Sequence, residues 1–256
     1  MQNRSKFLKA FDAFGFLTAV LVVVTWMYGL QARNWYRARG MKRSHPAVSL
    51  VPRPLSNTTV NRDKAMTLTA FGYRMDVPWA RLEAREDTTA VAVYLFTGGV
   101  GLRFWNPAKT TGAVEMMKQA AERAHRRFAD FLGARTEYDF LEAELKATPE
   151  QISPFMGKAE AFRQGLLLNM KLFELEREPY AIYSIALGNL KGFQIGDPAK
   201  DRLVELRTFD SGEREFRLLF AVERGSNVRL EQSEINGVLN SLRSTPETDP
   251  AGANAQ

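Results

Sequence analysis

Apolar and polar residues alternate near the start of the folded part of the chain, which predicts a first block of β-strands. Residues 66–71 and 72–77 alternate, and residues 90–97 and 100–105 form the β-branched and aromatic runs that are typical of buried strands. Two glycines at 98–99 separate the last two runs, and glycine supplies the positive φ angles of a tight turn. The pattern therefore predicts hairpins and, with them, antiparallel pairing.

The spacing of apolar residues then changes to steps of three and four, which predicts helices. Residues 112–133 form one amphipathic pattern and residues 137–146 a second, while Ser153-Pro154 provides the cap and first residue typical of a third. Residues 166–173 alternate again, which predicts a strand rather than a fourth helix.

A second block of strands follows, and a helix ends it. The predicted strands cover residues 180–187, 188–196, 202–209 and 215–222. Ser233 is a favourable cap for a final amphipathic helix. The order of strands, helices, strands and helix, with hairpin connections, predicts an α+β domain with a mainly antiparallel sheet flanked by helices.

A continuous apolar segment near the N-terminus predicts a single transmembrane helix. The segment from Ala13 to Leu30 carries no charge, and as a helix it would be about 27 Å long against roughly 30 Å of hydrocarbon. Aromatic residues that favour the headgroup layer gather at its C-terminal end, namely Trp26, Tyr28, Trp35 and Tyr36. The run is longer than the apolar core of a signal peptide, so we expect an uncleaved anchor.

The basic charge of the chain belongs to the flanks of this segment. The net charge is +6, yet residues 1–43 hold eight basic residues against one acid, and the remainder holds 27 against 28. The C-terminal flank contains Arg33, Arg37, Arg39, Lys42 and Arg43. The nearly neutral domain argues against a nucleic-acid partner, whereas these aromatic and basic residues predict a membrane-interface set in contact with a lipid bilayer.

These patterns divide the chain into five regions. We expect a basic tail over 1–12, a transmembrane anchor over 13–31, a basic juxtamembrane segment and linker over 32–64, the α+β domain over 65–244 and a disordered tail over 245–256. Both flanks of the anchor are basic, which leaves two orientations open. Because an N-terminal anchor exports the domain that follows it, we favour a cell-membrane protein with an extracytoplasmic domain over a cytoplasmic one.

The composition excludes several kinds of chemistry. The chain has no cysteine and only two histidines, His45 and His125, which excludes disulfides, thiolate catalysis and Cys-ligated metals. No phosphate loop or calcium loop is present, so we predict no cofactor, no metal site and no recognisable catalytic set. Carboxylates such as Asp76 or Asp197 are the candidates for acid–base work in a cleft beside the sheet.

Two segments near the ends of the domain carry a family resemblance. GYRMDVPWA at 72–80 and EINGVLNSLR at 234–243 frame an order of elements that resembles the PsbP-like family over about residues 66–243. The resemblance implies an αβα sandwich around an antiparallel sheet that closes with a helix. It implies no specific activity, because a fold does not determine a function.

Three hypotheses for function follow from the sequence. The leading one is a membrane-anchored, non-enzymatic binding or accessory module, whose ligand or protein partner the sequence does not identify. The first alternative is an enzyme of an unrecognised type that uses carboxylates in a cleft beside the sheet. The second alternative is a cytoplasmic-face protein that binds anionic lipid through the basic cluster between Arg33 and Arg43.

Overall fold

The computed structural model of the chain describes residues 29, 32–33, 35–36, 39–40, 49–56, 58–60, 65–79, 81–109, 130, 132–153, 155–175 and 179–245. The chain divides into two compact units, which we describe separately. The helical unit comprises residues 1–47 and 143–176, and the β unit comprises residues 48–142 and 177–256.

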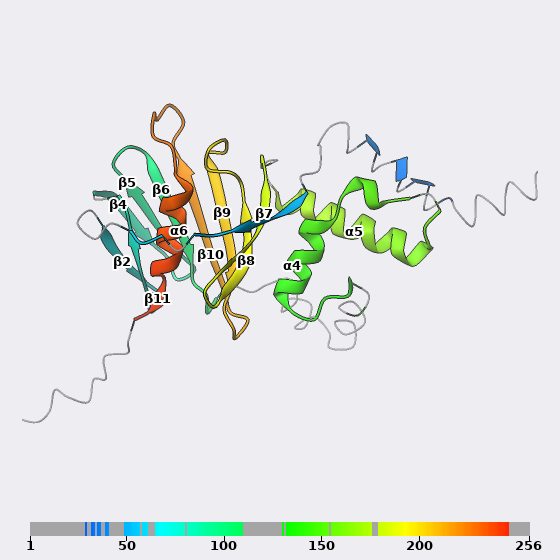
Figure 1. Cartoon of the computed structure of the whole chain (residues 1–256), viewed down its shortest axis with the longest axis horizontal. Helices are drawn as coiled ribbons and strands as arrows, with labels where there is room; N and C mark the ends of the chain where they lie inside the picture. The colour runs from blue at the N-terminus through cyan, green and yellow to red at the C-terminus, as the bar shows by residue number, and fades with distance from the viewer. Residues whose placement is uncertain are drawn as a thin grey trace, which may run out of the picture. The chain divides into compact units, whose positions relative to one another are not determined.

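An eight-stranded sheet forms most of the β unit (Figure 1). Its strand order is β1-β7-β8-β9-β10-β6-β5-β4, and every neighbouring pair is antiparallel except β1 and β7. The predicted α+β class with a mainly antiparallel sheet is therefore confirmed. The strands are β1 (Leu50–Pro54), β4 (Leu82–Asp87), β5 (Val91–Phe96), β6 (Val100–Trp105), β7 (Ile182–Leu187), β8 (Leu190–Ile195), β9 (Leu203–Phe209) and β10 (Glu215–Val222).

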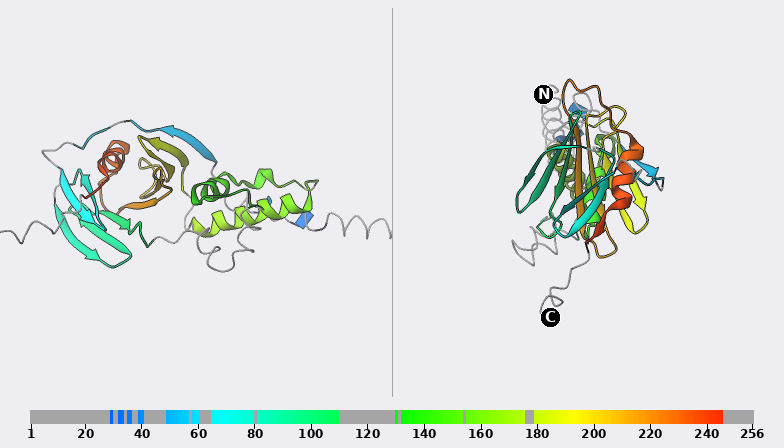
Figure 2. Two further views of the ribbon diagram at one scale, coloured as in Figure 1. Left: turned by 90° about the horizontal axis from the view of Figure 1, so that it is seen from below. Right: turned by 90° about the vertical axis from the view of Figure 1, so that its left-hand side faces the viewer.

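One face of this sheet, the inner face, is covered by a helix and a smaller sheet. The strands curve around α6 (Gln232–Ser241), as the left view of Figure 2 shows. The smaller sheet has the order β11-β3-β2. Its β3 strand packs on the larger sheet through Tyr73, whose ring centre lies 5.2 Å from that of Phe216 and 6.3 Å from that of Phe104. The strands are β2 (Met66–Ala70), β3 (Tyr73–Val77) and β11 (Arg243–Ser244).

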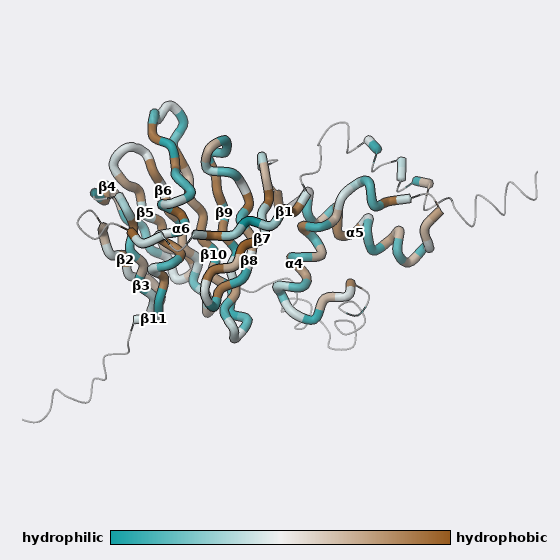
Figure 3. The backbone as a smooth tube through the Cα atoms, viewed as in Figure 1, coloured by the Kyte–Doolittle hydropathy of each residue, from teal (hydrophilic) through white to brown (hydrophobic). Residues whose placement is uncertain are grey.

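Alternation along each strand explains which side chains form the core. Ala92, Tyr94 and Phe96 of β5 are buried, whereas the residues between them are partly or fully exposed. In Figure 3 the strands carry apolar stretches and the connecting turns are mostly hydrophilic. Gly98 and Gly99, with φ angles of 93° and 79°, form the predicted turn between β5 and β6.

Three strands lie outside the segments predicted as strands, namely β1, β4 and the two-residue β11, and the first two are edges of the larger sheet. β1 lies in the segment predicted as a linker, and an edge position tolerates its two prolines, Pro52 and Pro54. β4 has the charged sequence LEARED and exposes all of its residues except Leu82, which is half-buried. Charges and prolines at edges hinder pairing with other chains. Neither segment shows the alternation by which the other strands were predicted.

Helices follow β6 in the chain. They are α4 (Glu137–Lys146), which has the predicted bounds, a 3-10 turn over Pro149–Gln151, and α5 (Lys158–Glu174). The strand predicted over 166–173 is wrong, because these residues belong to α5. Ala161, Leu168 and Lys171 are buried at the spacing of one helix face. The helix predicted over 112–133 lies mostly outside the described residues.

The predicted transmembrane helix is corrected by the structure. No helix in the described ranges is long and apolar enough to cross a membrane. The helices α4 and α6 have 10 residues each, and the 17-residue α5 contains charged side chains, whereas a bilayer needs about 20 mostly apolar residues. The predicted span from Ala13 to Leu30 lies outside the described residues apart from Gly29. The extracytoplasmic location stays a prediction.

Candidate functional site

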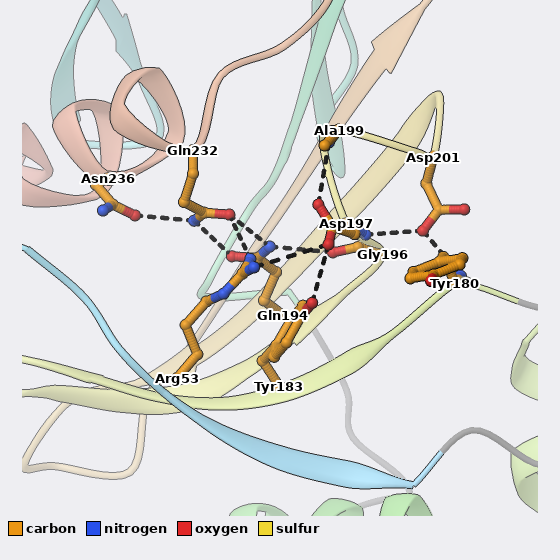
Figure 4. Close-up of polar contacts among 10 residues, drawn as sticks. All are labelled: Arg53, Tyr180, Tyr183, Gln194, Gly196, Asp197, Ala199, Asp201, Gln232 and Asn236. Carbon is orange, nitrogen blue, oxygen red and sulfur yellow. Dashed lines mark hydrogen bonds and ion pairs between the residues drawn. The ribbon is translucent and has the colours of Figure 1, made fainter.

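Polar side chains from β1, β7, β8 and α6 meet at the N-terminal end of α6 (Figure 4). We call Arg53, Tyr183, Gln194, Asp197 and Gln232 the Arg53 network. The Arg53 guanidinium lies 3.7 Å above the centre of the Tyr183 ring and donates a 2.7 Å hydrogen bond to Gln232 Oε1. It also lies 3.8 Å from the Asp197 carboxylate. Arg53 thereby ties the edge strand β1 to α6.

The other members of the network are also bonded to one another. The side-chain amides of Gln194 and Gln232 exchange two hydrogen bonds, of 2.9 and 2.8 Å, and Gln232 also donates to Asn236. The Tyr183 hydroxyl donates to Asp197 at 3.0 Å. Burial, together with this hydrogen bond, raises the pKa of Tyr183 above its ordinary value.

The loop after β8 completes the network through backbone contacts. Asp201 Oδ2 accepts hydrogen bonds from the backbone N–H groups of Asp197 and Tyr180, at 2.7 and 2.9 Å, and Asp197 Oδ1 accepts one from Ala199. The polar groups of the network thus bind other parts of the protein. We infer that its role is to hold β1 and α6 against the sheet.

A cavity of about 650 Å³ lies in the β unit beside the C-terminal end of α6. It is bordered by the β7–β8 hairpin, the β9–β10 turn, β3 and β11. Its apolar lining residues are Leu55, Tyr73, Ala186, Leu187, Leu190, Phe216, Leu239 and Leu242, and its charged ones are Asp210, Arg214 and Arg243. Volumes between about 300 and 1,000 Å³ are usual for small-molecule sites.

Each charged lining residue has a hydrogen bond or an ion pair with a neighbour. Arg214 Nη1 donates a hydrogen bond to the Tyr73 hydroxyl. Arg243 Nη2 lies 3.6 Å from Asp76 Oδ2, and its side chain is 51% exposed. Asp210 Oδ1 accepts hydrogen bonds from the backbone N–H groups of Gly212 and Arg214, both at 2.9 Å. Two arginines therefore line the cavity, while its one carboxylate binds the backbone of a turn.

The carboxylates predicted as catalytic candidates lie in different surroundings. Asp197 belongs to the Arg53 network, and Asp76 on β3 accepts a 2.7 Å hydrogen bond from the Thr67 hydroxyl. Neither residue lines the cavity. Within the described ranges, no three His, Cys, Asp or Glu side chains are grouped as metal ligands would be. His45 and His125 lie outside those ranges.

The residues predicted as a membrane-interface set are only partly described. Arg33, Trp35, Tyr36 and Arg39 are helical, with the Arg39 guanidinium 4.4 Å above the Trp35 ring and Tyr36 77% exposed. The remaining members lie outside the described residues, namely Trp26, Tyr28, Arg37, Lys42 and Arg43. Their contact with a lipid bilayer therefore stays a prediction.

Sequence reasoning missed the residues of the cavity, because they come from segments far apart in the chain. Arg214 follows a turn, and Arg243 lies just after the last helix. The sequence around each arginine is typical of an ordinary surface residue, and only the fold brings the two arginines to one cavity. No protein-family model matches the chain, and no similar protein was found among curated sequences or solved structures. The resemblance to the PsbP-like family therefore stays a prediction.

Proposed function

We propose that the β unit is a binding module that takes a small organic molecule into the cavity beside the end of α6. The observation that carries the proposal is the cavity itself, with its volume of about 650 Å³ and its combination of leucine side chains with two arginines. A site of this kind binds by burial of apolar surface and is oriented by its few polar groups.

The construction of the walls supports this role. Leu187 and Leu190 flank the β7–β8 turn, and Leu239 lies on α6. The Arg53 network fixes α6 to these strands at the other end of the helix. A site on strands and helices that are held in place loses little conformational entropy when it binds.

The test uses the neutral fluorescent probe 1-N-phenylnaphthylamine with the full chain. Fluorescence should increase on binding, with saturation at one site. Ser244→Trp places an indole beside the cavity from an exposed position of β11, and it should weaken binding at least tenfold, or about 1.4 kcal/mol. Leu187→Trp should do the same from the β7–β8 hairpin.

Ser233→Trp is the matched control. Ser233 is exposed at the N-terminal end of α6 and does not line the cavity, so this variant should bind the probe as the wild type does. Circular dichroism spectra would establish that the variants fold. Absence of saturable binding, or equal binding by Ser244→Trp, Leu187→Trp and the control, would refute the proposed function.

A further inference from the structure

We propose that the cavity binds an anionic amphiphile, whose carboxylate, sulfonate or phosphate group contacts Arg214 and Arg243 while its apolar part lies against the leucines. This inference rests on the proposed function and specifies the class of ligand. The inference depends on the hydrogen bonds and ion pairs that the charged residues around the cavity form, as well as on the size of the cavity.

The charge at the lining is positive. Arg214 and Arg243 oppose the single carboxylate of Asp210, and that carboxylate binds the N–H groups of Gly212 and Arg214 in the β9–β10 turn. A guanidinium carries five N–H donors, and the hydrogen bond from Arg214 to the Tyr73 hydroxyl uses one of them. The Tyr73 contact orients Arg214 without neutralising it.

A second arginine beside Arg243 increases this positive charge. Arg74 of β3 is the cross-strand partner of Arg243 in β11, and like charges placed opposite each other destabilise a sheet. Arg74 Nε is buried and has no hydrogen-bond partner within the described part of the chain. Asp76 lies 3.6 Å from Arg243 and also accepts a hydrogen bond from Thr67. Arg243 thus pairs with Asp76 at 3.6 Å, and a bound anion would add a second negative charge near Arg243.

The rest of the cavity selects an apolar group. Leu187, Leu190 and Leu239 are half-buried or buried and line it from three elements, β7, β8 and α6. A fully ionic ligand would leave these side chains without a favourable contact, and a fully apolar one would desolvate the arginines without compensation. A molecule with one anionic end and an apolar body satisfies both parts of the lining.

The experiment compares ligands that differ only in the charged group. Decanoate, decyl phosphate and decanol compete with 1-N-phenylnaphthylamine for the full-length protein. In the wild type, decanoate or decyl phosphate should displace the probe at a concentration at least about tenfold lower than decanol, because charged hydrogen bonds are stronger than neutral ones. Which of the two anions binds more tightly distinguishes a carboxylate from a phosphate ligand.

Variants then identify the residues that bind the charged group of the ligand. Arg214→Gln and Arg243→Gln change exposed side chains, and together they should reduce the preference for the anion to less than about threefold while leaving displacement by decanol unchanged. Arg224→Gln is the matched control, because Arg224 is exposed and does not line the cavity. It should keep the wild-type preference.

Three negative results would have different consequences. Equal displacement by decanoate, decyl phosphate and decanol, in a protein whose probe binding Ser244→Trp weakens, would overturn the anionic ligand and leave the proposed function standing. A preference that survives in the double arginine variant would also overturn it. Failure of the wild type to bind the probe at all would overturn both proposals.

Discussion

A buried lysine in the helical unit makes the stability of that unit depend on pH. Lys171 of α5 is only 2% exposed, and its Nζ donates to the carbonyl oxygens of Leu145 and Ala147 at 2.8 and 3.0 Å. These carbonyls belong to the end of α4 and the residue after it, so Lys171 satisfies groups that the helix leaves open. Burial lowers the pKa of Lys171 to about 8, although Glu144 and Glu150 act in the opposite direction.

The size and sign of this pH dependence follow from the difference between the pKa of Lys171 in the folded state and its pKa in the unfolded state. An unfolded chain holds the same proton with a pKa of about 10.4. Between about pH 8 and pH 10 the unfolded state therefore binds more protons than the folded state, and the free energy of unfolding increases with pH. The Lys171 contribution should rise by about 2 kcal/mol between about pH 7.5 and pH 9.5.

Urea titrations of the full chain, followed by far-ultraviolet circular dichroism at several pH values, would measure this increase. Lys171→Met should be less stable, because two carbonyls lose their donor, and its free energy of unfolding should lack the increase between about pH 7.5 and pH 9.5. Lys158→Met, which changes an exposed lysine at the start of the same helix, should retain it. The same increase in Lys171→Met and the wild type would refute the reasoning.

Three further predictions concern single residues. Gly192→Ala should lower the free energy of unfolding by about 3 kcal/mol or more, because a Cβ there would lie 2.1 Å from the Arg207 carbonyl oxygen of β9; normal urea stability would contradict this. Arg207→Met should cost about 3–5 kcal/mol, because it leaves Glu215 buried without the 2.6 Å ion pair. The double variant Arg207→Met/Glu215→Leu should recover most of that loss in the same titration, and no recovery would count against it. Glu160, whose pKa the Arg163 hydrogen bond lowers to about 2, should stay ionised down to about pH 3 by carbon NMR, whereas Arg163→Gln should shift its midpoint to about pH 4; an unchanged midpoint would be evidence against this pairing.

The strands that alternate could be predicted from the sequence, because one side of each faces the core. β2, β3, β5 and the pairs joined by glycine or aspartate turns all follow that rule. β4 was not predicted, because an edge strand that is exposed on nearly every residue has no buried apolar side and therefore no alternating pattern. Residues 166–173 gave the opposite error, since the three adjacent leucines at 166–168 fit either period, and the burial of Ala161 and Lys171 is what identifies the helix.

The candidate site could not be predicted in the same way. Its leucines were recognised as apolar positions of strands and of the last helix, but a cavity is the space that these elements leave unfilled. That space depends on the curvature of the sheet around α6, which no local pattern specifies. Arg214 and Arg243 are separated in the chain by β10 and α6, so their proximity to one cavity is a property of the fold alone.

The parallel strand β1 has a practical consequence for work with shortened forms of the protein. The alternating pattern alone would place the start of the domain at residue 65, and a chain begun there would lack both β1 and the Leu55 wall of the cavity. The backbone groups of β7 that β1 occupies would then be open to other molecules, without the prolines that protect the edge. Such a fragment should self-associate through its sheet, so recombinant fragments of the β unit need to begin before Leu50 to keep this edge of β7 paired.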